Sequence, residues 1–299
     1  MKLIRPETVT DTIFQSSDVP EADYSAWLVG TTYADADRVI VTTPNIHKIY
    51  ESQQAANTGN DPTTDDGTWW LEVSSTNRWK MFDAIVQDQT VQATQIVTTL
   101  QSPTVVNSMA FLNVEATTIE VTVTDAVEGV VYDETFNMTS YSGIQDWYAY
   151  FFEPIIRKDQ LAITDLPPYA NASIEVTINA SADAKIGALV MGQFADLGLS
   201  QHGASLSIID YSTKTTDAQG RVTITDGPYA DKMEVDVVLD TSQIGQANAT
   251  LSSLRTTPAV WIAEDNNDDL VIYGYYREFD IILSNPTISR LSLEIEGLV

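Results

Sequence analysis

Apolar and polar residues alternate in short runs along much of the chain, which is the pattern of strands that bury one face. Between residues 76 and 197 the alternating runs are 92–100, 117–125, 130–138, 160–165 and 172–180. Two further runs, 147–156 and 185–194, are apolar or aromatic almost throughout and are predicted to be buried strands. Because turn residues separate these runs, the pattern predicts an antiparallel β-sandwich over residues 76–197.

The alternation continues over residues 198–299, with one exception. Its runs are 205–213, 221–227, 232–240, 259–265, 270–283 and 289–298, and the sequence DAQG at 217–220 predicts a hairpin turn. In the exception, Ile244, Ala247, Leu251 and Leu254 recur at helical spacing, and Pro258 follows them. We therefore expect a mainly β protein whose C-terminal β-rich domain, residues 198–299, contains one helix near 242–256.

The first 75 residues divide into two parts. Residues 1–22, which we call the N-terminal arm, contain Pro6, Pro20 and few apolar residues. An extended segment of this kind cannot bury itself, so it must lie on its own domain or on a neighbouring subunit. Residues 23–75 combine short strand-like pieces with many aromatic residues, and about fifty residues without a disulfide are near the lower limit for independent folding. We expect two or three short strands that lean on the next domain.

Composition excludes several functional classes. The 299 residues include 15 Lys and Arg against 42 Asp and Glu, which gives a formal net charge of −27. Such a chain lacks the basic surface that general nucleic-acid binding or attraction to an anionic membrane requires. Cysteine is absent, so disulfides and thiolate chemistry are excluded. No run is apolar enough for a signal peptide or a membrane helix, so we expect neither secretion by that route nor membrane insertion.

Residues that carry chemistry are scarce. His47 and His202 are far apart and lack a His-x-x-x-His pattern, and a triad of His202 with Asp210 and a nearby serine lacks the Gly-x-Ser-x-Gly turn. The densest acidic run is 264–269, where the oxygens of Asp265, Asp268 and Asp269 suit Ca²⁺. The run has no EF-hand spacing, and a hairpin tip is the simpler interpretation. We expect no cofactor and no enzymatic activity.

Residues 26–71 contain an ordered series of motifs: Trp27, Tyr33, Asp37-Arg38-Val39, Tyr50, Asp61-Pro62 and Trp69-Trp70. This order resembles that of small chitin-binding-type carbohydrate modules, which have Trp, Tyr, Gly-Asp-x-Val, Gly-x-x-Tyr, Asn/Asp-Pro and Trp. It departs from the pattern at Ala36, which stands in place of a glycine, and around 45–47, where a second glycine is missing.

This resemblance implies that aromatic rings stack on the apolar faces of sugar rings. The candidate sugar-binding residues are Trp27, Tyr33, Trp69 and Trp70. The alternative is that these aromatic residues form the core of a very small domain.

The whole chain also resembles a group of bacteriophage and prophage virion proteins that are encoded with tail genes. The matching motifs are Leu3-Ile4-Arg5-Pro6, 76–83, 146–154 and 292–298. The resemblance implies a structural component of the virion, in the tail, its fibre or its baseplate, that is made in the host cytoplasm. Its partners would be other virion proteins, further copies of itself and a host surface glycan, with the N-terminal arm as a strap onto a neighbouring subunit. The alternatives are a free carbohydrate-binding protein and, more distantly, a polysaccharide depolymerase.

Overall fold

The computed structural model describes residues 1–140, 146–152, 156–201, 203–217, 219–264, 270–283 and 285–298. The protein is mainly β, as predicted, with 55% of its residues in strands and 8% in helices. One large antiparallel sheet joins β1 (Lys2–Pro6), β2 (Phe14–Ser17), β8 (Thr90–Gln101), β9 (Ser108–Glu115), β10 (Thr118–Asp125), β11 (Gly129–Asn137), β14 (Gln160–Ile163), β15 (Ser173–Asp196), β16 (Leu199–Ser200), β17 (Ser205–Asp210), β20 (Tyr229–Asp240), β21 (Ala259–Ile262), β22 (Val271–Ile282) and β23 (Ile288–Gly297).

Smaller sheets and short helices complete the described chain. The remaining strands are β3 (Thr32–Tyr33), β4 (Arg38–Val41), β5 (Lys48–Ser52), β6 (Asn57–Thr58), β7 (Trp70–Ser75), β12 (Thr139–Ser140), β13 (Ile156–Arg157), β18 (Thr213–Thr216) and β19 (Val222–Thr225). The helices are η1 (Lys80–Phe82), α1 (Trp147–Phe152), η2 (Thr241–Gln243) and α2 (Ile244–Ser253). The predicted C-terminal helix is therefore confirmed as α2.

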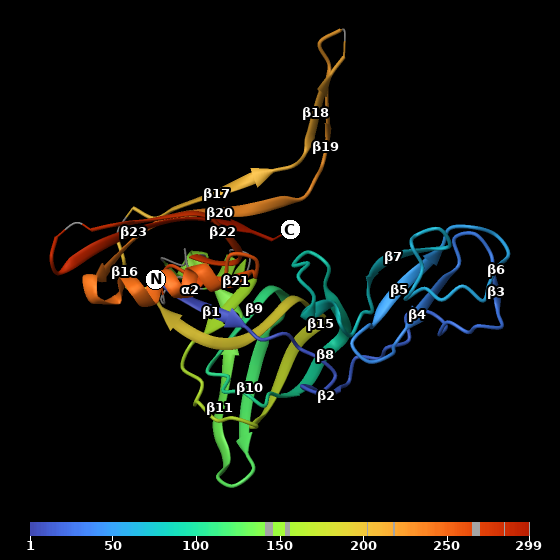
Figure 1. Ribbon diagram of the computed structural model, residues 1–299, viewed down its shortest axis with the longest axis horizontal. Coiled ribbons are helices and arrows are strands. Elements are labelled where there is room, and N and C mark those ends of the chain that lie inside the picture. Colours follow the sequence, from blue (N-terminus) through green and yellow to red (C-terminus); the bar gives the residue numbers. More distant parts are fainter. Residues whose placement is uncertain are drawn as a thin grey trace.

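Strand β15 connects the two β regions that the sequence separates. Its 24 residues pair with β8 and β10 in the first half and with β9 and β1 in the second. From β1 the sheet continues through β21, β22, β23 and β20 (Figure 1). The predicted regions 76–197 and 198–299 thus share one sheet.

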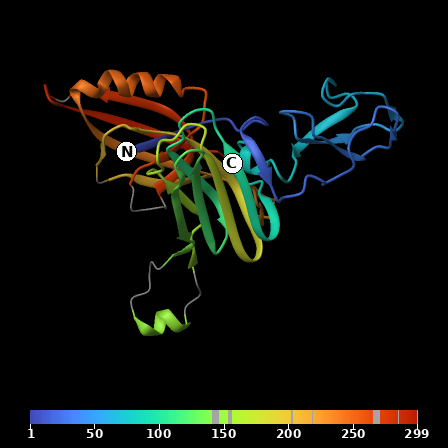
Figure 2. The same cartoon turned by 90° about the horizontal axis from the view of Figure 1, so that it is seen from below.

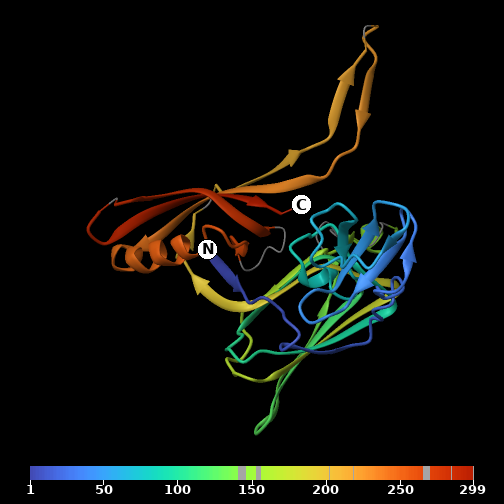
Figure 3. The same cartoon turned by 45° about the vertical axis from the view of Figure 1, so that its right-hand side comes forward.

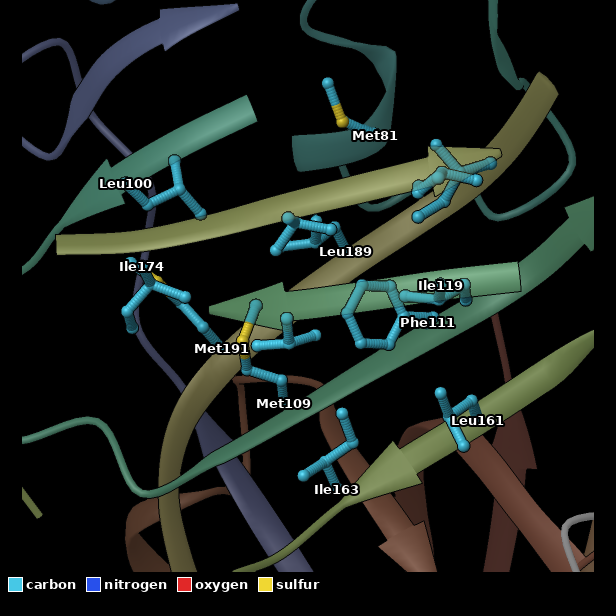
Figure 4. Packing of buried hydrophobic residues seen from close by; sticks show 14 of the residues in the cluster. Met81, Leu100, Met109, Phe111, Ile119, Leu161, Ile163, Ile174, Leu189 and Met191 are labelled. Atoms are coloured by element: carbon cyan, nitrogen blue, oxygen red, sulfur yellow. The ribbon is translucent and has the colours of Figure 1, made fainter. Parts of the chain in front are cut away.

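The core of the sandwich-like half follows directly from the alternation in the sequence. Ile119, Val121 and Val123 of β10 lie opposite Ile178, Val176 and Ile174 of β15, and all six are buried. On the other side of β15, Ile96 and Leu100 of β8 continue the same layer. Phe111, Met109 and Met191 fill the space between the layers (Figure 4). Each buried side chain of this size contributes about 1.5–3 kcal/mol.

A second core lies between the C-terminal strands and α2. Met233, Val235 and Val237 of β20 pair with Ile295, Leu293 and Leu291 of β23. Helix α2 covers this face with Ala247 and Leu251, two of the residues that predicted it. Trp261 is fully buried beside them, and its indole nitrogen donates a hydrogen bond to the carbonyl oxygen of Gly274 at 3.0 Å.

The N-terminal arm lies on its own chain, which is the first of the two expected alternatives. Strand β1 occupies the position between β15 and β21, with Leu3 in the C-terminal core and Ile4 in a cluster between the two halves. The arm and β15 approach so closely at Gly192 that a Cβ there would collide with the carbonyl group of Arg5. Further along the arm, β2 pairs with β8.

Residues 23–75 form a separate small unit beside the large sheet (Figures 1 and 2). Strands β4, β5 and β7 make a three-stranded sheet, and β3 pairs with β6. The unit has its own core of Tyr33, Val39, Val41, Tyr50 and Trp70. The expectation was two or three short strands that lean on the next domain, whereas the unit has five short strands, β3 to β7, and a core of its own.

Candidate functional site

The aromatic residues of the small unit mostly pack against one another. Trp70 is 2% exposed and Tyr33 is 8% exposed, and their rings meet edge to face at 5.1 Å between centroids. The Tyr33 hydroxyl accepts a hydrogen bond from the amide of Leu28 at 2.8 Å, and the indole nitrogen of Trp70 donates to the carbonyl of Asn60 at 2.9 Å. Two of the four candidate sugar-binding residues are therefore core residues, and only the half-buried Trp27 and Trp69 retain partial exposure.

Turns of the small unit adopt the backbone conformation that glycine favours. Ala36, which stands at a glycine position of the carbohydrate-module pattern, has φ of 66°. Asn45 and His47, in the segment where the second glycine is missing, have φ of 62° and 47°. These values lie in the left-handed region, which non-glycine residues rarely occupy. The turn geometry is thus kept although the glycines are not.

A cluster of charged residues joins the small unit to the N-terminal arm and to the segment after residue 75. In this cluster, which we call the polar latch, His47 Nδ1 lies 2.8 Å from Glu21 Oε1, and His47 Nε2 lies 3.0 Å from Asp11 Oδ1. Glu21 Oε1 also accepts a hydrogen bond from Thr76, and Arg78 Nη1 lies 3.4 Å from Glu21 Oε2. Both ring nitrogens of His47 therefore face carboxylate oxygens of the arm.

Trp79 forms the apolar side of this junction. Its ring stacks on His47 at 4.0 Å and contacts Phe14 of β2 and Phe82 of η1. A cavity of about 190 Å³ lies here, lined by His47 of the latch, by Trp79 and by arm residues 8–10. Asp83 also lines it, and burial raises the pKa of the Asp83 carboxyl, of which Oδ2 has no hydrogen-bond partner. The His47 side chain is buried at this junction.

A larger cleft, of about 380 Å³, lies between the two halves of the large sheet. Its walls include Asp159 before β14, Asp231 of β20 and Tyr273 of β22. Partial desolvation, and then the charge of Asp159, raise the pKa of Asp231, although that side chain keeps contact with solvent. Burial raises the pKa of Tyr273. Asp159, Asp231 and Tyr273 are far apart in the sequence, so their spacing gave no signal for this cleft.

Two of the weaker candidates lie outside the described residues: the calcium ligands Asp265, Asp268 and Asp269, and His202 of the triad hypothesis. Within the described part of the chain, no group of three His, Asp or Glu side chains is placed to hold a metal ion. The helices among the described residues are all too short or too polar to cross a membrane.

A long hairpin projects from the large sheet at the positions where the sequence predicted a turn. Strand β17 pairs with β20. Beyond Tyr211 and Pro228 the two segments bend away from the sheet as the paired strands β18 and β19 (Figures 1 and 3). We call residues 213–225 the projecting hairpin. Its tip is closed by a hydrogen bond from the amide of Gly220, φ 81°, to the carbonyl of Asp217. The predicted hairpin turn is confirmed.

The projecting hairpin has two different faces. Because Lys214 lies opposite Ile224 and Thr216 opposite Val222, these four side chains share one face, and Thr213, Thr215, Thr223 and Thr225 form the other. Val222 and Ile224 are 61% and 60% exposed. At the base, Asp210 accepts hydrogen bonds from Ser212 and Lys214, which lower the pKa of Asp210 to about 2.

The prediction of a buried strand at 147–156 is wrong for residues 147–152, while 153–155 lie outside the described residues. Residues 147–152 form the short helix α1, which lies apart from the large sheet (Figure 2). Trp147 stacks on Phe151, and Tyr148 packs on Phe152, and these four side chains are between 67% and 77% exposed. The aromatic pairs are four residues apart, which is the spacing of a helix face. Neither the predicted strand nor burial applies, because the run is aromatic without belonging to the core.

Comparison with protein-family models gave no match to this chain, and comparison with curated proteins gave no significant match.

Proposed function

We propose that this chain is a structural subunit of a bacteriophage virion, in the tail, fibre or baseplate region, and that several copies assemble there. The observation that carries the proposal is the projecting hairpin. It places Val222 and Ile224 in water, on a two-stranded ribbon that reaches away from every core cluster. An isolated two-stranded hairpin is marginally stable in water, so a partner that covers its apolar face is the simplest reason to keep it.

The end-to-end resemblance to phage virion proteins supports the same function. Its motif residues contribute to the framework: Leu3 and Ile4 lie in β1, Trp79 lies against the polar latch, and Leu293 and Ile295 lie in the C-terminal core. Residues shared for packing are expected among proteins with a common scaffold.

The carbohydrate-binding function has less support. Sugar rings need an exposed aromatic face, and the burial of Tyr33 and Trp70 leaves Trp27 and Trp69 for that contact. Host glycan binding by the small unit therefore depends on these two residues. On a glycan array, Trp27→Ala or Trp69→Ala should abolish any signal that the native chain gives.

The direct test of the virion function uses purified particles. Phage particles are induced from the source strain, separated on a density gradient and probed with an antibody against this chain. We expect the chain to sediment with intact particles in several copies, and the antibody to label the tail in electron micrographs. Recovery of the chain exclusively in the unassembled fraction would overturn the proposal.

A further inference from the structure

Two hairpins of the described chain differ in charge. The projecting hairpin contains Lys214 and Arg221 against the carboxylate of Asp217, a net charge of +1 within a chain of net charge −27, and Lys214 pairs with Asp210 at the base of the hairpin at 3.2 Å. Residues 118–137, which form β10 and β11, contain five carboxylates and no Lys or Arg. The five are Glu120, Asp125, Glu128, Asp133 and Glu134. We call β10, β11 and their connecting turn the acidic hairpin.

Both hairpins also expose apolar side chains. In the acidic hairpin, Val127 of the turn is 91% exposed and Val130 of β11 is 61% exposed. Asp133 and Glu134 follow on the same strand and are exposed as well. The projecting hairpin offers Val222 and Ile224 beside its two cations. The projecting hairpin therefore combines exposed apolar side chains with Lys214 and Arg221, and the acidic hairpin combines them with carboxylates, as complementary interfaces do.

The two hairpins point to opposite ends of the molecule. In Figure 1 the projecting hairpin rises at the top and the acidic hairpin descends at the bottom. Strand β11 also ends the ordered path of strands that runs through β10, β15 and β1 to β20, with which β17 pairs. Within one chain the hairpins therefore do not meet. Between two copies they can meet by placing one molecule above another.

We propose that the projecting hairpin of one copy docks on the acidic hairpin of a second copy, so that the chains associate head to tail. This inference rests on the multicopy assembly of the proposed function and names its contact. The interface is heterologous, because different surfaces of the two copies meet. Repetition of such a contact generates a column, or a ring where the rotation closes.

Charge reversal on both sides of the contact tests the proposal. Variant A is Lys214→Glu with Arg221→Glu, and variant B is Asp133→Lys with Glu134→Lys. All four side chains are exposed, so both variants should fold, which circular dichroism checks. By sedimentation velocity over a concentration series, the native chain should associate. Each variant alone should associate with an apparent Kd raised about tenfold or more, because like charges then face each other.

A mixture of the two variants gives the decisive readout. The hairpin of A then faces the reversed surface of B, and the hairpin of B faces the native surface of A. Association should therefore recover in the mixture. A control matched to variant A is Arg255→Glu with Arg290→Glu. It makes the same change in net charge as variant A at exposed positions away from both hairpins, and it should associate like the native chain.

Three results would overturn the inference: a native chain that is monomeric at every concentration, variants that associate normally, or a mixture that does not recover. If the native chain is monomeric in solution but is found in particles, the head-to-tail contact is rejected and the virion function stands. Recovery in the mixture, with the chain absent from particles, would establish the contact and remove the virion function.

Discussion

The N-terminal arm and the projecting hairpin are both extended segments, yet one is enclosed by the fold and the other leaves it. Strand β1 has adjacent apolar residues, Leu3 and Ile4, and buries both faces between β15 and β21. The hairpin has apolar residues on one face and threonines on the other, and it borders no core cluster. Consecutive apolar residues therefore indicate a strand that is buried on both faces. A strand with apolar residues on one face, and with nothing in its own chain to cover that face, indicates a surface that another molecule covers.

The largest expected effect is on the free energy of unfolding, when one apolar side chain is truncated in each of the two segments. Leu3→Ala should lower the free energy of unfolding by about 2–5 kcal/mol, because it leaves a cavity in the C-terminal core. Ile224→Ala is the matched control on the exposed hairpin and should change it by about 0.5 kcal/mol or less. Urea denaturation measures both. Equal losses would contradict the contrast between the two segments.

The polar latch tests how firmly the far end of the arm is held. Glu21 is 8% exposed at its side chain and receives contacts from His47, Thr76 and Arg78. Glu21→Gln keeps the shape and removes the charge, so we expect a loss of about 1–3 kcal/mol in urea denaturation. The conservative change Lys185→Gln, at an exposed ion pair with Glu115, should cost about 1 kcal/mol or less. An equally small effect of Glu21→Gln would show that the latch does not hold the arm.

Asp83, which lines the cavity beside the polar latch, should make the stability of the folded protein depend on pH. Burial raises its pKa in the folded state, so the native protein retains a proton where the unfolded chain has released it. The stability from this proton is present at low pH and is lost as the pH rises from the ordinary carboxyl pKa through the raised one. Asp83→Asn should therefore raise the Tm at neutral pH.

The difference in Tm between Asp83→Asn and the native chain should vanish below the ordinary carboxyl pKa, near pH 4. Thermal melts between about pH 3 and about pH 8 measure it. A variant that is less stable at neutral pH would contradict the assigned direction.

The smallest expected effect is on the hairpin itself. Replacing residues 213–226 by Asn-Gly joins Ser212 to Gly227, at a point where Tyr211 and Pro228 already share a backbone hydrogen bond. No residue of this segment belongs to a core cluster, so the free energy of unfolding should change by about 0.5 kcal/mol or less. Urea denaturation measures it, and a large loss would show that the hairpin supports the fold.

Local pattern was sufficient for most strands of the large sheet, for the hairpin turn and for α2, because alternation and helical spacing are properties of neighbouring residues. It missed β9, and it divided β15 into two runs. The run 147–156 was misassigned because its aromatic residues lack the polar partners that reveal a period, and exposure cannot be read from hydrophobicity alone. The sequence order of the small unit also could not show that Tyr33 and Trp70 turn inward.

Contacts between distant segments were beyond prediction. Asp11, Glu21, His47 and Arg78 come together because the arm crosses the junction of two units, and Asp159 approaches Asp231 because β14 and β20 border one cleft. Charged residues are common in this chain, so no single carboxylate stands out before the topology is known. The two alternatives for the arm were similarly open until β1 was placed.

The position of β1 also has a consequence for biosynthesis. Leu3 is synthesised well before its two neighbours in the sheet, Ala195 and Trp261. At about 5–20 residues per second, the second neighbour follows on the order of tens of seconds later. During that interval the strand has no native partner on that side, so closure of the sheet must wait until the segment around Trp261 has been made. A chaperone that shields Leu3 and Ile4 during this time would raise the yield of folded chain.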